Sequence, residues 1–218
     1  PVSATITIVN TPPSIETVTI SPTTADYSDT LTCSWSGFDD IDGHDDSIGD
    51  EHIEWLASDG SILGTGSTLS GAFVGGDSIQ CRVTPFDGID TGDAVVSAPL
   101  TIDNTAPTLD SVSLLPVEPT VTDTLDCTPG SGSDPDGTTV FTYTYSWTVG
   151  GVEVPTETGS TLTAPAFYRG QTVQCFVTIS DGVDEGDEVG SNIVTVRNSR
   201  PVVDSLEIGP DEVRTNDV

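Results

Sequence analysis

Hydrophobic and polar residues alternate with a period of two along short runs in both halves of the chain. In the first half the runs lie at 16–20, 31–35, 53–56, 67–69, 78–83, 94–96 and 100–102; in the second they lie at 125–127, 143–147, 161–163, 172–177 and 193–196. Such alternation is typical of strands with one buried face, and no run shows the 3.6-residue period of a helix. Turn signals such as Asp59-Gly60 separate the runs. The pattern predicts an all-β fold with about seven strands per repeat.

The chain also repeats itself at a fixed interval. Pro13, Pro107 and Pro201 follow polar linkers and are spaced 94 residues apart (107 − 13 and 201 − 107), and residues 2–8 match residues 96–102 at the same offset. A fixed period of this kind indicates a tandem array of one structural unit. We therefore expect the last strand of a preceding repeat at 1–9, repeat one at 10–103, repeat two at 104–197 and the first strand of a following repeat at 198–218.

The charge of the chain is extreme for its 218 residues. Thirty-five acidic residues face five arginines and no lysine, which gives a formal net charge of −30. Nucleic acids and anionic membrane surfaces require basic patches, so neither is an expected partner. No apolar run approaches the roughly 18 residues of a membrane span, so we expect no membrane insertion in this segment. Without lysine, Lys–Asn isopeptide cross-links cannot form.

Each repeat carries two cysteines 48 residues apart with a tryptophan between them: Cys33, Trp55 and Cys81 in the first, and Cys127, Trp147 and Cys175 in the second. This order resembles the immunoglobulin-like β-sandwich, in which two cysteines bridge the sheets and the tryptophan packs on the bridge. The resemblance implies tandem immunoglobulin-like sandwiches with one inter-sheet disulfide and one core tryptophan per domain. The tyrosine that many such domains carry two residues before the second cysteine is replaced by isoleucine in one repeat and valine in the other.

Four cysteines allow three pairings, and the repeat selects Cys33–Cys81 and Cys127–Cys175. Buried free thiols in a cytosolic protein and a zinc site are the alternatives. Neither explains one matching pair per repeat, and the chain has no Cys-x-x-Cys motif. Disulfides place the protein in oxidising surroundings, which predicts an extracellular or cell-surface location.

Two acidic motifs recur at the 94-residue offset. Asp-x-Asp-Gly stands at 40–43 and 134–137, after the second strand, and Asp-Gly-x-Asp stands at 87–90 and 181–184, before the last strand. This wording is similar to the PKD-like and cadherin-like modules that are strung through very large secreted and surface proteins of bacteria. The resemblance covers the whole chain, and its motifs are specific for a class of module rather than for one function.

In an immunoglobulin-like topology both acidic loops and the incoming linker lie at the same end of the sandwich. We therefore expect two clusters of oxygen ligands, formed by Asn10, Asp40, Asp42 and Asp87 in one repeat and by Asp103, Asn104, Asp134, Asp136 and Asp181 at the next. Ca²⁺, which takes about six to eight oxygens, suits such clusters, with an expected Kd of about 10⁻⁴ to 10⁻³ M. The arrangement resembles cadherins, where calcium stiffens each junction. Ordinary Asp-Gly turns without an ion are the alternative.

Catalytic features are sparse. The two histidines, His44 and His52, lie in a long acidic loop, and we interpret them as solvated residues. No serine or cysteine nucleophile has a suitable basic partner, and no glycine-rich loop follows a strand and opens a helix. The chain is therefore not expected to be an enzyme. Trp35, whose counterpart in the second repeat is Pro129, is either a core residue or an exposed contact.

These features predict a structural segment of a long extracellular fibre, stalk or adhesin built from calcium-stiffened, disulfide-stapled repeats. Its expected partners are the neighbouring repeats of the same chain and further copies of itself in filaments. The alternative is a glycan- or protein-binding module of a multidomain secreted protein, with residues 44–51 as the place where the two repeats differ most. A passive spacer within a secreted hydrolase is a third interpretation.

Overall fold

The computed structural model describes residue 6 and residues 8–207. The first set of strands is β1 (Thr17–Ser21), β2 (Thr30–Ser36), β3 (Ile53–Leu56), β4 (Ile62–Thr65), β5 (Thr68–Ser70), β6 (Ser78–Val83), β7 (Val95–Val96) and β8 (Leu100–Thr101). The second set is β9 (Thr108–Leu109), β10 (Val112–Leu115), β11 (Leu125–Pro129), β12 (Gly132–Ser133), β13 (Thr142–Val149), β14 (Val152–Glu153), β15 (Thr161–Leu162), β16 (Thr172–Ser180), β17 (Val189–Gly190) and β18 (Val194–Thr195). The expected partial repeats at 1–9 and 198–218 fall largely on residues 1–5, 7 and 208–218, which lie outside the described part.

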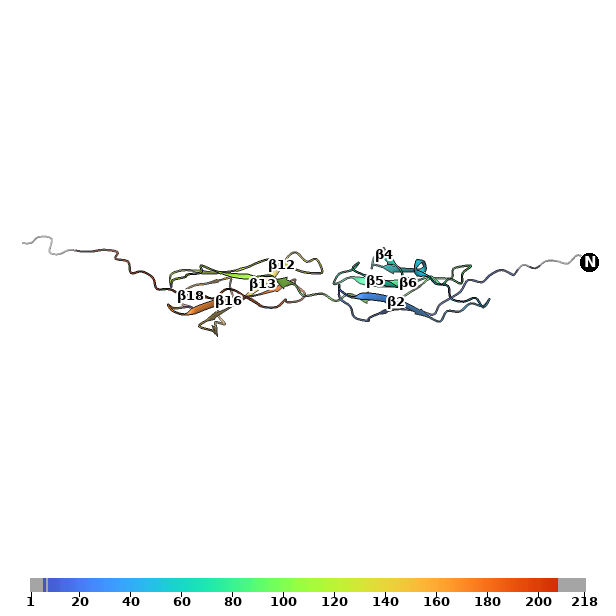
Figure 1. The fold of residues 1–218 in the computed structure, drawn as a ribbon, viewed down its shortest axis with the longest axis horizontal. Coiled ribbons are helices and arrows are strands. Elements are labelled where there is room, and N and C mark those ends of the chain that lie inside the picture. The colour runs from blue at the N-terminus through green and yellow to red at the C-terminus, as the bar shows by residue number, and fades with distance from the viewer. Residues whose placement is uncertain (1–5, 7, 208–218) are drawn as a thin grey trace, which may run out of the picture. The chain divides into compact units, whose positions relative to one another are not determined.

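Each set of strands forms two antiparallel layers (Figure 1). In the first, β1-β2-β5 faces β4-β3-β6-β7, and β8 also pairs with β6. In the second, β10-β11-β15 faces β14-β13-β16-β17, β18 pairs with β16, and β9 and β12 form a short ribbon. The two sandwiches share one topology, in which the fourth main strand (β4 or β14) pairs with the third (β3 or β13). In constant-type immunoglobulin domains the fourth strand instead joins the sheet of the first, second and fifth strands.

Alternation along the strands places one face of each sheet in the core. From β6 the side chains of Ile79, Cys81 and Val83 are at most 1% exposed, while the residues between them are half-buried. The corresponding strand β16 shows the same alternation, with four buried residues. This periodicity is what the sequence predicts, because a period of two puts every second side chain on the same face.

The tryptophans lie at the centre of the two cores. Trp55 and Trp147 are both 0% exposed. A buried indole N–H needs an acceptor, and each finds a backbone carbonyl at 2.9 Å, that of Gly66 in the first sandwich and that of Gly159 in the second. Trp55 lies directly opposite Cys81 across the β3–β6 pair, so the tryptophan neighbours the disulfide.

The disulfides confirm the expected pairing. Cys33–Cys81 joins β2 to β6, and Cys127–Cys175 joins β11 to β16, so each bond links the two sheets of its sandwich. Each closes a separation of 48 residues. The predicted fold class, tandem immunoglobulin-like sandwiches with one inter-sheet disulfide each, is therefore correct.

Several details go beyond the predicted strands. β4 and the two-residue strands β9, β12, β14 and β17 were not expected, because they are too short or too exposed to carry a clear alternation. A single turn of 3₁₀ helix, η1 (Asp50–His52), precedes β3. Trp35 is half-buried against the first core and donates its Nε1–H to Asp46 at 2.9 Å, so it is both a core and a surface residue.

The chain divides into two compact units whose limits do not follow the repeats. One comprises Pro1–Leu109, Gly132–Thr142 and Ile179–Asp187, and the other comprises Asp110–Ser131, Tyr143–Thr178 and Glu188–Val218. The repeat boundaries at residues 10–103 and 104–197 therefore stay predictions from the sequence. In the part of the chain that the structure describes, no helix is long and apolar enough to cross a membrane.

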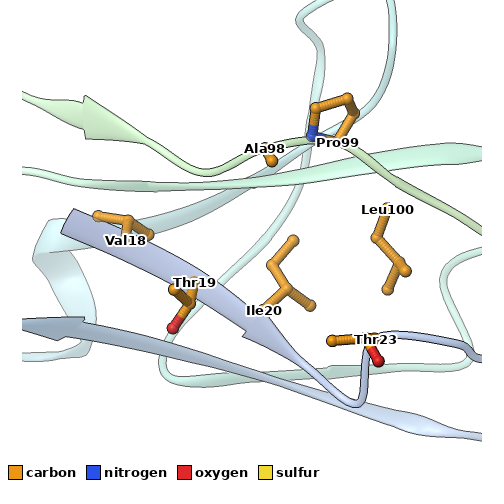
Figure 2. Close-up of a pocket in the computed structure, with 7 residues that line it drawn as sticks. All are labelled: Val18, Thr19, Ile20, Thr23, Ala98, Pro99 and Leu100. Carbon is orange, nitrogen blue, oxygen red and sulfur yellow. The ribbon is translucent and has the colours of Figure 1, made fainter.

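A hollow of about 330 Å³ lies beside β1 (Figure 2). Its lining is Val18, Thr19, Ile20, Thr23, Ala98, Pro99 and Leu100. These side chains are aliphatic apart from two threonine hydroxyls, and none is charged. The hollow therefore offers surface for contact but no groups for chemistry.

Removing one disulfide should destabilise its own sandwich. We expect Cys33→Ala/Cys81→Ala to lower the free energy of unfolding of the first sandwich by about 2–5 kcal/mol, because the bond restricts the unfolded chain. Urea denaturation followed by circular dichroism and tryptophan fluorescence measures the change. Cys127→Ala/Cys175→Ala is the matched control for the second sandwich. Unchanged unfolding midpoints in both variants would show that the cores do not depend on these bonds.

Candidate metal centre

The first acidic loop of repeat one is a tight turn closed by Asp40. Its Oδ1 accepts the backbone N–H of Asp42 at 2.7 Å, and its carbonyl accepts the N–H of Gly43 at 3.1 Å. Gly43 has a φ of 79°, a left-handed conformation that glycine adopts without a Cβ clash. This is the aspartate turn chemistry expected from the motif. It uses Oδ1 of Asp40 and leaves Oδ2 free for another partner.

The same turn recurs in repeat two. Asp134 Oδ1 accepts the N–H of Asp136 at 2.7 Å, its carbonyl accepts the N–H of Gly137 at 3.2 Å, and Gly137 has a φ of 88°. Two loops with the same spacing therefore fold in the same way. The Asp-x-Asp-Gly motif therefore determines the local structure of the loop.

The second acidic loop is organised by its first aspartate. Asp87 Oδ1 accepts the backbone N–H groups of Ile89 and Asp90, both at 2.7 Å. Equivalent bonds at 2.7 and 2.8 Å hold Asp181 in repeat two. The side chain of Asp87 is fully buried, so the turn points its Oδ2 inward rather than into solvent.

An asparagine from the incoming linker joins this loop in both repeats. Asn10 donates its Nδ2–H to Asp87 Oδ2 at 2.8 Å and to Asp90 Oδ2 at 3.1 Å. Asn104 makes the equivalent pair of bonds, both 2.9 Å, to the two aspartates 77 and 80 residues further on. One amide therefore bridges two carboxylates that would otherwise repel each other.

The other expected ligands are placed less uniformly. The residue after each asparagine donates its backbone N–H to the second aspartate of the turn, Asp42 in repeat one and Asp136 in repeat two, both at 2.6 Å. Asp103 is exposed and donates its backbone N–H to the Ala25 carbonyl at 2.8 Å. Eight of the nine expected residues therefore make side-chain hydrogen bonds within the acidic loops or between these loops and the linker. The ninth, Asp103, is held only through its backbone in the contacts described.

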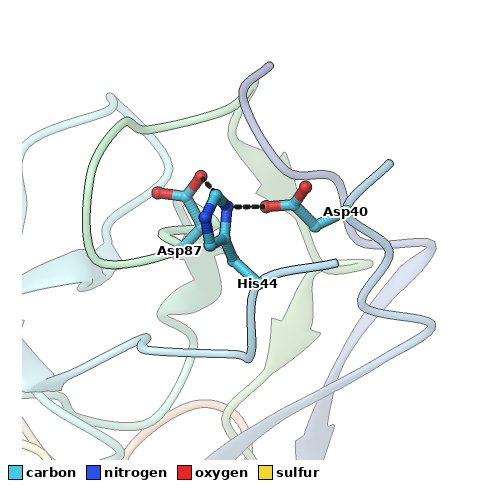
Figure 3. A group of neighbouring side chains, drawn as sticks. All are labelled: Asp40, His44 and Asp87. Carbon is cyan, nitrogen blue, oxygen red and sulfur yellow. Dashed lines mark ion pairs between the residues drawn. The ribbon is translucent and has the colours of Figure 1, made fainter. Parts of the chain in front are cut away.

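Repeat one adds a histidine to its cluster (Figure 3). His44 Nδ1 lies 3.4 Å from Asp40 Oδ2 and 3.7 Å from Asp87 Oδ2. Both carboxylate side chains are 0% exposed and that of His44 is 38% exposed. The expectation of a simply solvated histidine therefore misses its position between two buried acids. No pattern in the sequence of this acidic loop distinguishes the histidine.

Hydrogen bonding keeps the first aspartate of the second acidic loop, Asp87 or Asp181, ionised. Burial alone would raise the pKa of Asp87, but the bonds from Asn10 and from the N–H groups of Asp90 and Ile89 outweigh it and hold the pKa well below its usual range. The pKa of Asp181 is lowered chiefly by the hydrogen bond from Asn104 and then by backbone N–H groups. Both groups are therefore anionic at neutral pH.

Some buried polar atoms of the clusters have no hydrogen-bond partner. Asp40 Oδ2, Asp134 Oδ2 and Asn10 Oδ1 are buried and unpaired among the described residues. A buried unpaired polar atom costs about 1–3 kcal/mol, and more when it is charged. The first two are the same atom in each repeat. Turn chemistry alone does not use either oxygen.

Sequence reasoning also missed two second-loop aspartates. Asp90 and Asp184 accept bonds from the linker asparagines but were not among the expected ligands. Each is the closing aspartate of the Asp-Gly-x-Asp motif, so the motif itself carried the signal. The expected ligand sets included only the first aspartate of each loop, Asp87 or Asp181.

The chain matches no family model and no curated protein. Among solved structures it is similar to fibronectin type III-like modules of CbhA from Clostridium thermocellum (14% identity, TM-score 0.31, 88% of this chain and 100% of that one) and to a two-domain fibronectin type III segment of chicken tenascin (13%, 0.39, 84% and 99%). It is also similar to domains FN1–FN3 of chicken CNTN1 (14%, 0.35, 86% and 67%). These values are too low to assign the chain to a family.

Strand pairing and disulfides instead define the class. The protein consists of tandem immunoglobulin-like β-sandwich modules with one inter-sheet disulfide each.

The hydrogen bonds from the linker asparagines to the second acidic loop should make the free energy of unfolding depend on pH in the acid range. Since the folded pKa of Asp181 is depressed, its contribution is present above the unfolded pKa of about 3.9 and is lost as pH falls through the folded value. We expect the difference in unfolding free energy between wild type and Asn104→Ala, measured in chelator, to shrink between neutral pH and strong acid.

Asn192→Ala is the matched control for this experiment. Asn192 bonds the backbone of Leu114 at 2.9 and 3.1 Å and touches no carboxylate in the contacts described, so its loss should cost the same at every pH. A difference for Asn104→Ala that stays constant across the titration would contradict the assigned role.

Proposed function

We propose that the protein is a non-catalytic structural segment of a long extracellular fibre, stalk or adhesin, in which bound cations stiffen a series of disulfide-stapled sandwiches. The two disulfides support an oxidising compartment. The formal charge of −30 keeps neighbouring chains apart except where cations join them. The resemblance of the acidic motifs to PKD-like and cadherin-like modules supports a surface protein of bacterial type.

One observation carries this proposal most directly. In both repeats the linker asparagine enters the fold and bonds two aspartates of the second acidic loop, at the same offsets of 77 and 80 residues. A freely swivelling tether needs no such bridge. A linker fixed at the end of each repeat is what a stiff series of modules requires.

Calcium is the proposed ion at the cluster of repeat two. Asn104, Asp134, Asp136, Asp181 and Asp184 offer only oxygen atoms as ligands, and Ca²⁺ prefers oxygen. The unpaired Oδ2 of Asp134 supports the assignment, because the turn itself leaves this buried oxygen without a partner. We propose a divalent cation at the cluster of repeat one as well.

The contacts of the long loop in repeat one favour this function over a binding module. Trp35 Nε1–H bonds Asp46, and the Ser47 N–H bonds the Phe86 carbonyl, both at 2.9 Å. The residues that distinguish repeat one are therefore used to tie the loop to its own sandwich. Partners of the segment are then neighbouring repeats and further copies of the chain.

Calcium should raise the melting temperature of the protein. With Kd of about 10⁻⁴ to 10⁻³ M, calcium at ten to a hundred times Kd should stabilise a binding unit by about 1.4 to 2.7 kcal/mol. Differential scanning calorimetry with calcium and with chelator measures the shift. Asp134→Ala/Asp136→Ala should remove the part of the shift that belongs to repeat two.

Asp110→Ala is the control for that double variant, since it removes an aspartate that caps another turn through Ser131. Identical melts in calcium and chelator would leave only the turn interpretation. Electron microscopy of the native material tests the larger assembly: extended fibres support the proposal, and globular particles oppose it.

A further inference from the structure

The cluster of repeat one differs from that of repeat two in one ligand type. Asp40 Oδ2, His44 Nδ1 and Asp87 Oδ2 converge, with all three ligand atoms within 4.8 Å of one another (Figure 3). An imidazole nitrogen beside two carboxylate oxygens is a donor set for borderline transition metals, whereas calcium prefers oxygen throughout.

We propose that Asp40, His44 and Asp87 form a site for a divalent transition metal of the zinc type. Tetrahedral zinc with bonds of about 2.0–2.2 Å places its ligand atoms roughly 3.3–3.6 Å apart. The observed separations of His44 Nδ1 from the two carboxylate oxygens, 3.4 and 3.7 Å, are close to this spacing. The two aspartates and a neutral imidazole balance the charge of one divalent ion.

The buried state of the acids is an independent reason to place a cation here. The side chain of Asp40 is 0% exposed, and its Oδ2, which faces His44, has no hydrogen-bond partner. The side chain of Asp87 is equally buried, although Asn10 satisfies one lone pair of its Oδ2. Burying charged oxygens is costly unless they are paired or coordinate a metal.

The site also has a route to solvent. A hollow of about 370 Å³ adjoins it and is lined by Ile8, Val9, Asn10, Asp42, His44 and Ile89. An ion can enter through this hollow, and water can supply the fourth ligand that three protein groups leave open.

Repeat two provides a natural comparison. Thr138 stands where repeat one has His44, 94 residues earlier, at the same distance after the turn glycine. The turn before it has the same hydrogen bonds, at 2.7 and 3.2 Å against 2.7 and 3.1 Å. The histidine is thus the difference that separates the two clusters in their choice of ion.

This inference rests on the proposed function only in assigning a cation to the cluster of repeat one. Isothermal titration calorimetry of the metal-free chain with zinc, in a millimolar excess of calcium, tests it. We expect one zinc ion per chain. His44→Gln should weaken zinc binding at least about tenfold. His52→Gln should leave it unchanged, because His52 is not among the clustered ligands: its ring stacks on Phe86 at 4.6 Å, and its Nε2 lies 3.7 Å from Glu51.

Two further measurements make the result specific. In nitrogen-detected NMR spectra zinc should shift the ring nitrogens of His44 and leave those of His52 in place. Thr138→His should raise the zinc stoichiometry from one to two, because it installs the same ligand beside Asp134 and Asp181. Circular dichroism confirms that each variant is folded.

Zinc affinity that is unchanged by His44→Gln, or that calcium abolishes, would overturn the proposal. A Thr138→His chain that still binds one ion would contradict the assignment of selectivity to this position. The calcium-dependent melt of repeat two involves no histidine. Loss of zinc binding with an intact calcium shift therefore removes this inference alone, and the reverse result removes the calcium proposal alone.

Discussion

Buried carboxylates at the end of each sandwich need positive or hydrogen-bonding partners, and this need organises the rest of the structure. Asn10 and Asn104 supply part of what is required, since each amide bridges two aspartates of the second acidic loop. Backbone N–H groups of the tight turns supply more. What remains unpaired, Asp40 Oδ2 and Asp134 Oδ2, is the same atom in both repeats. The proposal of metal binding rests on this remainder rather than on the number of acidic residues.

The two cores explain why the loops can hold such groups in place. A disulfide between sheets and a buried tryptophan next to it fix β2 against β6 in the first sandwich, and the second repeats the arrangement. The acidic loops leave these strands directly, at Ser36 and Val83 in the first sandwich. Rigid strands therefore present short turns with little freedom, which is the condition for a preformed ion site.

The sequence predicted the fold well because the repeat, the cysteine spacing and the alternation are independent and agree. The immunoglobulin-like topology predicted that the two acidic loops converge at one end of the sandwich. The 94-residue repeat predicted that Asn10 and Asn104 occupy equivalent places beside them. The sequence could not predict the role of His44, because an acidic, exposed loop gives a histidine no pattern to distinguish it. For Asp103 the repeat predicted too much. Its position beside the linker suggested a ligand, but the residue is exposed and is held through its backbone N–H.

Anomalous X-ray scattering from crystals grown with calcium and zinc tests the central claim most directly. The account predicts a zinc peak within bonding distance of Asp40, His44 and Asp87, and a calcium peak beside Asp134 and Asp181. Density for water alone at both positions, with the carboxylates unmoved, would contradict it.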